Sequence, residues 1–280
     1  MGELEQAYKD YARTADMINL DLSNWLPSFR SGDPNIPHSR VRPLVPGEFL
    51  LMIGDTGTGK TAILQNIARS TAWGVLCFEL ELPDTLMFER FAVIENAKTC
   101  ERIERIYHGG GSVRVDTLDH IITVTQPTSI EDMESIIKRA QATADNAPVI
   151  VLVDYVGLVR ARGNRYERLS NVAEGLKVLA KATNTIIVSS SQRRRGSDDD
   201  NEVRLHDAKD SGALENSAGV VLGLWRDPDD AELLTVRVLK NTKGRAGLTI
   251  KCDFDGPTMR ITERKPVVPA FDDGLDVEEY

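Results

Sequence analysis

The chain has 280 residues, 41% of them hydrophobic, which is enough to bury the core of one large domain. A net charge of −9 argues against a broadly basic surface, but five acids and no base lie in residues 266–280, so the remainder carries −4 and local basic loops are not excluded. The three cysteines are scattered, which argues against a disulfide framework. The sequence shows no apolar run of membrane-spanning length and no signal-peptide pattern, which argues against a membrane partner. Together these features predict a cytoplasmic protein.

The first 47 residues differ in pattern from the rest. In residues 1–30 apolar side chains recur at helical spacing, which predicts an amphipathic helical segment. Residues 31–47 are rich in proline and irregular, which is typical of a linker. The members of the apolar stripe are Leu4, Tyr8, Tyr11, Ala12, Ala15 and Ile18.

Residues 48–265 form the predicted main domain, in which strand-like and helix-like patterns alternate. The predicted strands are 47–53, 74–80, 121–125, 148–154, 183–192, 220–226, 233–240 and 248–254. The predicted helices are 61–70, 83–96, 128–144, opened by a capping box of Thr128 and Glu131, and 167–182. This order predicts an α/β fold with a mostly parallel central sheet flanked by helices. The acidic residues 266–280 are predicted to be disordered.

The stretch GDTGTGKT fits the phosphate-binding pattern G-x-x-x-x-G-K-[ST] and lies between a predicted strand and a predicted helix. Glycines let backbone N–H groups surround a phosphate chain, and the helix N-terminus adds partial positive charge. Lys60 can reach the β- and γ-phosphates, and the Thr61 hydroxyl can hold Mg²⁺, so the cofactors predicted are ATP and Mg²⁺. The residues of this loop are Gly54, Asp55, Thr56, Gly57, Thr58, Gly59, Lys60 and Thr61.

Carboxylates at two other strand ends complete the predicted hydrolytic site. Asp154 ends the strand 148–154, and the carboxyl ends of parallel strands face the ligand, so Asp154 is the predicted second contact to Mg²⁺. Tyr155 follows it, so the group that activates water must come from another strand end. Glu79 and Glu81 are both available, and strand alternation directs them to one face. Glu81 is nearer the strand end and is the predicted choice; the alternative is that both are solvated or salt-bridged.

In this order the motifs resemble the RecA-type ATPase domain of DnaB-family replicative helicases. The resemblance covers roughly residues 48–262 and rests on GDTGTGKT, FELEL-P, VLVDYVGLV, ERLSNVAEGLKVLAKATN leading to SSSQ, DAKDSGALENSAG and KNTKGRAG. It implies a RecA-like P-loop NTPase core, in which the glutamate matching Glu81 is the catalytic base. The glutamine matching Gln192 senses the γ-phosphate, and the loops after Asp154 and Gln192 grip single-stranded DNA.

Both of those loops are basic here. Guanidinium groups match phosphate oxygens, so two basic loops at adjacent strand ends are predicted to converge on one DNA strand. The alternative for either loop is a solvated cluster of charges, since three aspartates follow the second loop in SSSQRRRGSDDD. The predicted DNA-binding residues are Arg160, Arg162, Arg165, Arg193, Arg194 and Arg195.

Two departures from the family pattern concern contacts between subunits. The family's arginine finger, which acts on a neighbouring subunit's nucleotide, matches Thr242, so Lys240, Lys243 and Arg245 are the candidates to replace it. Only residues 1–47 precede the predicted ATPase domain, where the family has a larger N-terminal domain. A linker helix docks on the neighbouring subunit in that family, so the apolar stripe in residues 1–30 packs either there or on its own domain.

The resemblance implies an ATP-driven helicase or translocase that forms a homo-oligomeric, hexameric ring on single-stranded DNA. A small motor of this kind suggests replication of a phage or other mobile element, with replication or loader proteins as partners. Two alternatives stay open. One is a DNA-binding ATPase that does not unwind, such as a recombinase-like filament former or a loader, and the other is a regulatory ATPase that remodels a protein.

Overall fold

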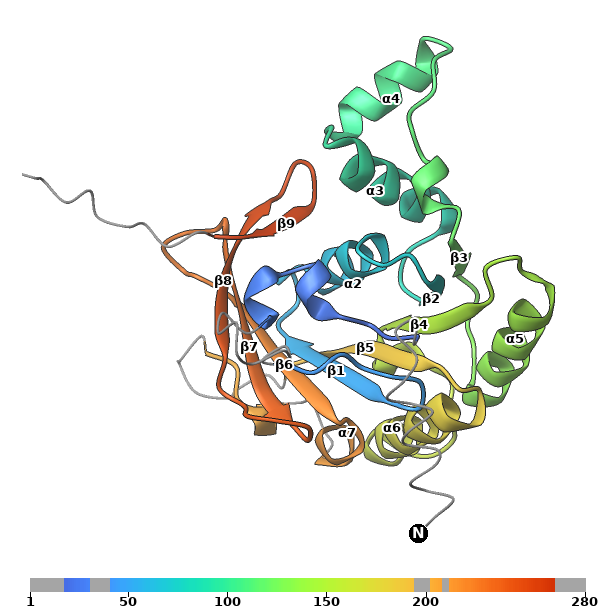
Figure 1. The fold of residues 1–280 in the computed structure, drawn as a ribbon, viewed down its shortest axis with the longest axis vertical. Helices are drawn as coiled ribbons and strands as arrows, with labels where there is room; N and C mark the ends of the chain where they lie inside the picture. Colours follow the sequence, from blue (N-terminus) through green and yellow to red (C-terminus); the bar gives the residue numbers. More distant parts are fainter. Residues whose placement is uncertain (1–17, 31–40, 194–201, 208–211, 265–280) are drawn as a thin grey trace, which may run out of the picture.

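The computed structural model describes residues 18–30, 41–193, 202–207 and 212–264, and these form one α/β domain (Figure 1). The described strands are β1 (Phe49–Gly54), β2 (Gly74–Glu79), β3 (Ile121–Val124), β4 (Pro148–Asp154), β5 (Ile186–Gln192), β6 (Val220–Arg226), β7 (Leu233–Asn241), β8 (Thr249–Asp255) and β9 (Arg260–Glu263). The described α-helices are α2 (Lys60–Arg69), α3 (Asp84–Asn96), α4 (Cys100–His108), α5 (Ile130–Thr143), α6 (Arg165–Ala182) and α7 (Gly212–Ser217).

The strands form one nine-stranded sheet in the order β3-β2-β4-β5-β1-β6-β7-β8-β9. The first six strands in this order run parallel, and β7, β8 and β9 add to the sheet as antiparallel neighbours. Parallel strands need crossovers, and the helices along the chain supply them. The predicted α/β fold with a mostly parallel sheet is confirmed.

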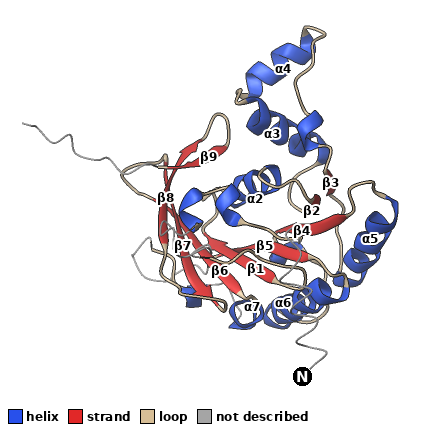
Figure 2. Ribbon diagram, in the orientation of Figure 1, coloured by secondary structure: helices blue, strands red, loops and turns tan. Residues whose placement is uncertain are grey.

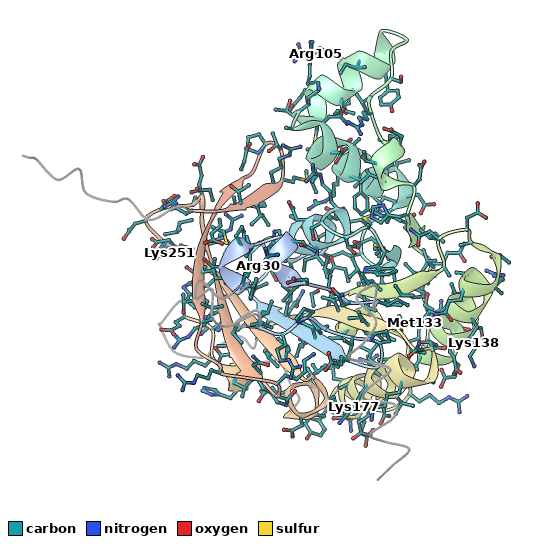
Figure 3. All side chains as sticks on the ribbon, in the orientation of Figure 1. Arg30, Arg105, Met133, Lys138, Lys177 and Lys251 are labelled. Carbon is teal, nitrogen blue, oxygen red and sulfur yellow. The ribbon has the colours of Figure 1, made fainter. Side chains whose placement is uncertain are left out.

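Helices cover both faces of the sheet, so the central strands are buried on both sides (Figure 2). All six residues of β1 and all six of β2 are buried. One face packs against α2 and α3, where Ile63 and Phe91 are buried. The other packs against α5, α6 and α7, and Met133 lies between α5 and the sheet (Figure 3). A strand buried on both faces reads as a continuous apolar run, which explains the sequence PVIVLVD of β4.

The described residues before β1 belong to the core of the same domain, although the sequence predicted a separate segment and a linker. Leu26 and Phe29 are fully buried, and residues 22–24 and 27–29 form two 3₁₀ turns instead of a continuous helix. Leu20 and Leu44 exchange backbone hydrogen bonds of 2.9 and 3.0 Å. Of the predicted apolar stripe only Ile18 lies within the described residues. The predicted boundary at residue 48 therefore cuts through packed structure.

Other local predictions need correction. Helix α5 is capped by Ser129 and Asp132, not by Thr128 and Glu131, because the Thr128 hydroxyl donates to the Gln126 carbonyl at 2.6 Å and is turned away. Helices α4 and α7 and strand β9 were not predicted. Among the described residues no helix has the length and apolar character needed to cross a membrane.

Candidate active site

The phosphate-binding loop, the predicted metal ligand Asp154 and Gln192 meet at the carboxyl ends of neighbouring parallel strands. Gly54, at the end of β1, lies beside Gln192, at the end of β5, in the sheet register. Glu79, at the end of β2, lies beside Asp154, at the end of β4. Four short sequences separated by up to 138 positions therefore share one edge of the sheet, where parallel α/β proteins bind their ligands.

The phosphate-binding loop has the backbone that its glycines allow. Gly57 and Gly59 have φ angles of 82° and 102°, in the left-handed region that side chains disfavour. A Cβ on Gly54 would lie 2.9 Å from the carbonyl oxygen of Leu224 on β6, so a larger residue there would separate the two strands. Helix α2 begins directly after the loop, so the free N–H groups of its first turn point toward the loop's concave side.

The Lys60 side chain is fixed by hydrogen bonds to the backbone of the phosphate-binding loop. Its side chain is buried, and Nζ donates to the carbonyl oxygens of Gly54 and Asp55 at 3.0 and 2.7 Å. Burial lowers the pKa of the Lys60 ammonium, and the nearby carboxylates, Asp154 first among them, oppose this shift. A cation fixed at the mouth of an anion-binding loop can bind and stabilise a phosphate chain.

Thr61 and Asp154 form a contact suited to a hard metal ion. The Thr61 hydroxyl donates to Asp154 Oδ2, and the Ser190 hydroxyl donates to Oδ1 at 2.7 Å. A hydroxyl and a carboxylate oxygen at the loop are the donors that Mg²⁺ prefers beside phosphates. These residues fit that ion. Ser190 was not singled out in the sequence, although strand alternation places it on the Asp154 face of β5.

The two candidate glutamates have different surroundings. Glu81 lies beyond the end of β2, is exposed, and lines the pocket formed by the phosphate-binding loop and Gln192. Glu79 is 2% exposed, and burial, followed by the charge of Asp154, raises its pKa to about 7. Glu81, the predicted choice, therefore lines the pocket. The role of Glu81 as catalytic base stays a prediction.

Two residues that line the pocket, Arg90 and Phe254, and Arg226 stacked on the second, were missed in the sequence. Arg90 of α3 lines the pocket beside Glu81, and its Nε donates to Gln65 Oε1 at 3.2 Å. On the other side, Phe254 of β8 lines the pocket, and the Arg226 guanidinium lies 3.9 Å from its ring centroid. Arg226 Nε also donates to the carbonyl oxygen of Thr58 at 3.2 Å. This flat stack abuts the phosphate-binding loop, but its members are far apart in sequence and no local pattern marks them.

The loop after β4 presents part of the predicted DNA-binding set. Arg160 and Arg162 are exposed and line a groove beside the start of α5. A second pocket extends from Tyr155 and Arg168 to Gln192, which therefore lines both this pocket and the nucleotide pocket. The side chain of Arg165, and Arg194 and Arg195 entirely, lie outside the described residues.

For Arg193 the structure differs from the sequence prediction. Its side chain is 7% exposed, and Nε donates to Asp207 Oδ2 at 3.0 Å. Nη2 donates to the Glu202 carbonyl at 3.1 Å, and Nη1 lies 3.6 Å from Asp55 Oδ2. The Arg193 guanidinium is therefore enclosed by groups of its own chain and is not accessible to a DNA strand.

The three candidate finger residues differ in whether their side chains are bound within their own chain. Lys240 Nζ donates to the Glu215 carbonyl at 2.6 Å. Lys243 Nζ donates to Glu48 Oε2 at 2.6 Å and to the Pro43 carbonyl at 2.7 Å. Both lysines are thus bound within their own chain. Arg245 is exposed at the turn between β7 and β8, so it is the candidate best placed to reach another subunit.

Comparison with known proteins adds a family and a fold. The family model for the DnaB-like helicase C-terminal domain matches residues 39–263. A solved structure of an ATPase domain is similar, with a TM-score of 0.77 and 19% identity, over 94% of this chain and 98% of that one. A DnaB-like replicative helicase, described with its interactions with primase, has a TM-score of 0.70 and 20% identity over 79% of this chain.

This chain spans 58% of the length of that replicative helicase. The RadB recombinase is similar at a TM-score of 0.54 and 17% identity, over 79% of this chain and 92% of that one. At these identities the solved structures establish a shared RecA-like fold. No curated protein sequence matches the chain.

Proposed function

The chain belongs to the DnaB-like helicase C-terminal domain family, and from this premise we propose that it is an ATP-dependent DNA helicase or translocase. ATP with Mg²⁺ binds at the edge formed by β1, β2, β4 and β5. Hydrolysis drives movement along single-stranded DNA. We propose residues 48–265 as the motor domain, with the described residues before β1 packed on its core.

The observation that carries this proposal is that four functional side chains line one pocket and that a fifth, Asp154, is hydrogen-bonded to one of them. The loop lysine binds phosphate, the hydroxyl and the aspartate hold Mg²⁺, the glutamate accepts a proton from the attacking water, and the glutamine contacts the γ-phosphate. The metal supplies charge neutralisation at the phosphates when bound. The groups are Lys60, Thr61, Asp154, Glu81 and Gln192.

Aromatic and cationic side chains beside the phosphate-binding loop support the assignment of the pocket to a nucleotide. The face of Phe254 and the guanidinium stacked on it form a flat, cationic surface beside the loop, which suits a nucleobase. Arg90, on the opposite wall, adds a cation from the same chain. The pocket therefore has places for the base, the phosphates and the metal ion of one nucleotide.

Gln192 supports a link between ATP and DNA because it lines both pockets. One contains the phosphate-binding loop, and the other opens toward Arg168 and the basic loop after β4. We propose that this loop, with Arg160 and Arg162, contacts the DNA backbone. Assembly into a hexameric ring, with Arg245 reaching a neighbour's nucleotide, completes the motor. Primase-type or loader proteins are the proposed partners, and a mobile-element setting remains a prediction.

The test measures hydrolysis, unwinding and assembly together. Lys60→Ala should abolish ATP hydrolysis, because the lysine neutralises charge that develops on the phosphates. The unsubstituted protein should be stimulated by single-stranded DNA, unwind a tailed fork, and form closed rings in electron micrographs with an ATP analogue. DNA-independent hydrolysis with no unwinding would contradict the proposal.

A recombinase-like ATPase is the second candidate, because the RadB recombinase shares the fold over most of its length. The same micrographs separate the two. Open filaments on single-stranded DNA without fork unwinding favour this candidate, and closed rings with unwinding favour the helicase.

A further inference from the structure

Glu79 holds the backbone of the residue proposed to activate water. It is the last residue of β2, and its Oε1 accepts hydrogen bonds from the backbone N–H groups of Glu81 and Leu82, both at 3.1 Å. Its side chain is almost completely buried. The carboxylate therefore bridges the end of the strand and the bend that presents Glu81 to the nucleotide pocket.

This bend needs such an acceptor. The last rung between β2 and β4 in this region is the bond from Leu80 N to the Asp154 carbonyl, at 2.9 Å. Beyond it the chain leaves the sheet toward Pro83, which precedes α3, so the N–H groups of residues 81 and 82 have no ladder partner. A carboxylate can accept both, and charged acceptors make stronger hydrogen bonds than neutral ones.

We propose that Glu79 is a positioning residue for ATP hydrolysis, fixing the backbone at Glu81 and Leu82 and so setting where the Glu81 carboxylate lies relative to the phosphates. This rests on the proposed function, in which Glu81 activates water. The Glu79 side chain is enclosed among Thr61, Gln65 and Met87 and does not line the nucleotide pocket, so it is not placed to contact the attacking water.

Four variants separate positioning from chemistry. Glu79→Gln keeps a side-chain oxygen that can accept both N–H groups. Glu79→Met has similar length but no such acceptor, and Glu79→Asp keeps the charge while withdrawing the oxygen by one methylene. Glu81→Gln removes the proposed base. Each is measured for kcat, for KM and for the Kd of an ATP analogue, with thermal unfolding to confirm that it is folded.

If Glu79 positions Glu81, Glu79→Met and Glu79→Asp lower kcat on the order of 100-fold, the usual effect of a misplaced catalytic group, with KM and analogue affinity unchanged. Glu79→Gln restores kcat close to that of the unsubstituted protein. In a Glu81→Gln background, the Glu79→Met change causes no further loss, because the group that it positions is already gone.

Three outcomes overturn the proposal. Normal kcat in both Glu79→Met and Glu79→Asp, with Glu81→Gln inactive, removes the positioning role and leaves the proposed function intact. Glu79→Gln as inactive as Glu81→Gln shows that the Glu79 charge itself takes part in the chemistry. Full activity of Glu81→Gln would show that Glu81 is not the catalytic base, so Glu79 could not act through it. If Glu79→Met does not fold, Glu79→Asp decides.

Discussion

Arg193 donates from Nε to Asp207 Oδ2 at 3.0 Å, and both side chains are almost completely enclosed. The same aspartate oxygen accepts the backbone N–H of Arg204 at 2.9 Å. Arg193 directly follows Gln192, and its own N–H donates to the Gly54 carbonyl at 3.0 Å. The pair thus ties the end of β5 to the phosphate-binding loop and to residues 202–207.

Removing this cation should destabilise the fold. Arg193→Ala leaves the Asp207 carboxylate buried without its partner, which costs roughly 3–5 kcal/mol of unfolding free energy. Arg193→Lys keeps the charge and should lose less. Arg114→Ala, in an exposed pair with Asp116, is the control and should cost under about 1 kcal/mol. Urea unfolding measures all three, and an Arg193→Ala value equal to the control would contradict the structural role.

Glu79 should make stability depend on pH. Its pKa in the folded protein is about 7, against an ordinary value of 4.5. Between these values the folded state binds more protons than the unfolded state, so stability falls as pH rises through this window, and the full penalty is present above it. Glu79→Gln cannot ionise and should remove this decline.

The measurement compares unfolding free energies at pH 5 and pH 8 without nucleotide. Glu79→Gln should gain on the unsubstituted protein by up to about 3 kcal/mol at the higher pH. Glu104→Gln, on the exposed side of α4, is the matched control. Parallel pH profiles for Glu79→Gln and the unsubstituted protein would show that the buried carboxyl does not carry this penalty.

The basic loop after β4 should determine the salt dependence of DNA binding. Removing one phosphate contact lowers the slope of log affinity against log salt by about 0.7 for single strands. Arg160→Ala and Arg162→Ala should each flatten the slope by that amount. Arg105→Ala is the control, because Arg105 is exposed on α4, away from the sheet (Figure 3). Equal slopes for all three variants would indicate that the loop after β4 is a solvated cluster of charges that does not contact DNA.

Arg245 should act on a neighbouring subunit's nucleotide. We expect Arg245→Ala and Lys60→Ala to be inactive separately and to regain ATP hydrolysis when mixed, because some interfaces then pair an intact loop with an intact arginine. Lys243→Ala, whose lysine is bound to its own Glu48, is the control and should hydrolyse ATP without mixing. Full activity of Arg245→Ala alone, or mixed oligomers that stay inactive at every ratio, would rule out the trans role.

The sequence was most informative where function and local structure share a short pattern. The strand, glycine loop and helix around Lys60 were predicted correctly because each has its own signal within ten residues. Periodicity could not separate Glu79 from Glu81, because alternation assigns both to one face and does not show that β2 ends at Glu79. In the structure the Glu79 side chain accepts the backbone N–H groups of Glu81 and Leu82, a local contact that depends on where the strand ends and bends.

Contacts between distant segments could not be predicted. The bond from Arg226 to Thr58 joins residues 168 positions apart, and only the sheet order brings them together. Arg193 looked exposed because it opens a run of three arginines, yet it is buried against Asp207, fourteen positions later. Helix α4 was missed although Cys100, Ile103 and Tyr107 recur at helical spacing, and Ile103 is its only buried residue.

The central place of β1 has a consequence for how the site fluctuates. β1 is paired on one side with β5 and on the other with β6, and none of its residues is exposed. Amide protons of such a strand exchange with solvent only when the whole domain opens, whereas peripheral elements open in smaller units. We therefore expect the phosphate-binding loop to extend from a slowly exchanging strand. The turn at Arg245 joins β7 and β8, away from the centre of the sheet, and is expected to open in a smaller unit.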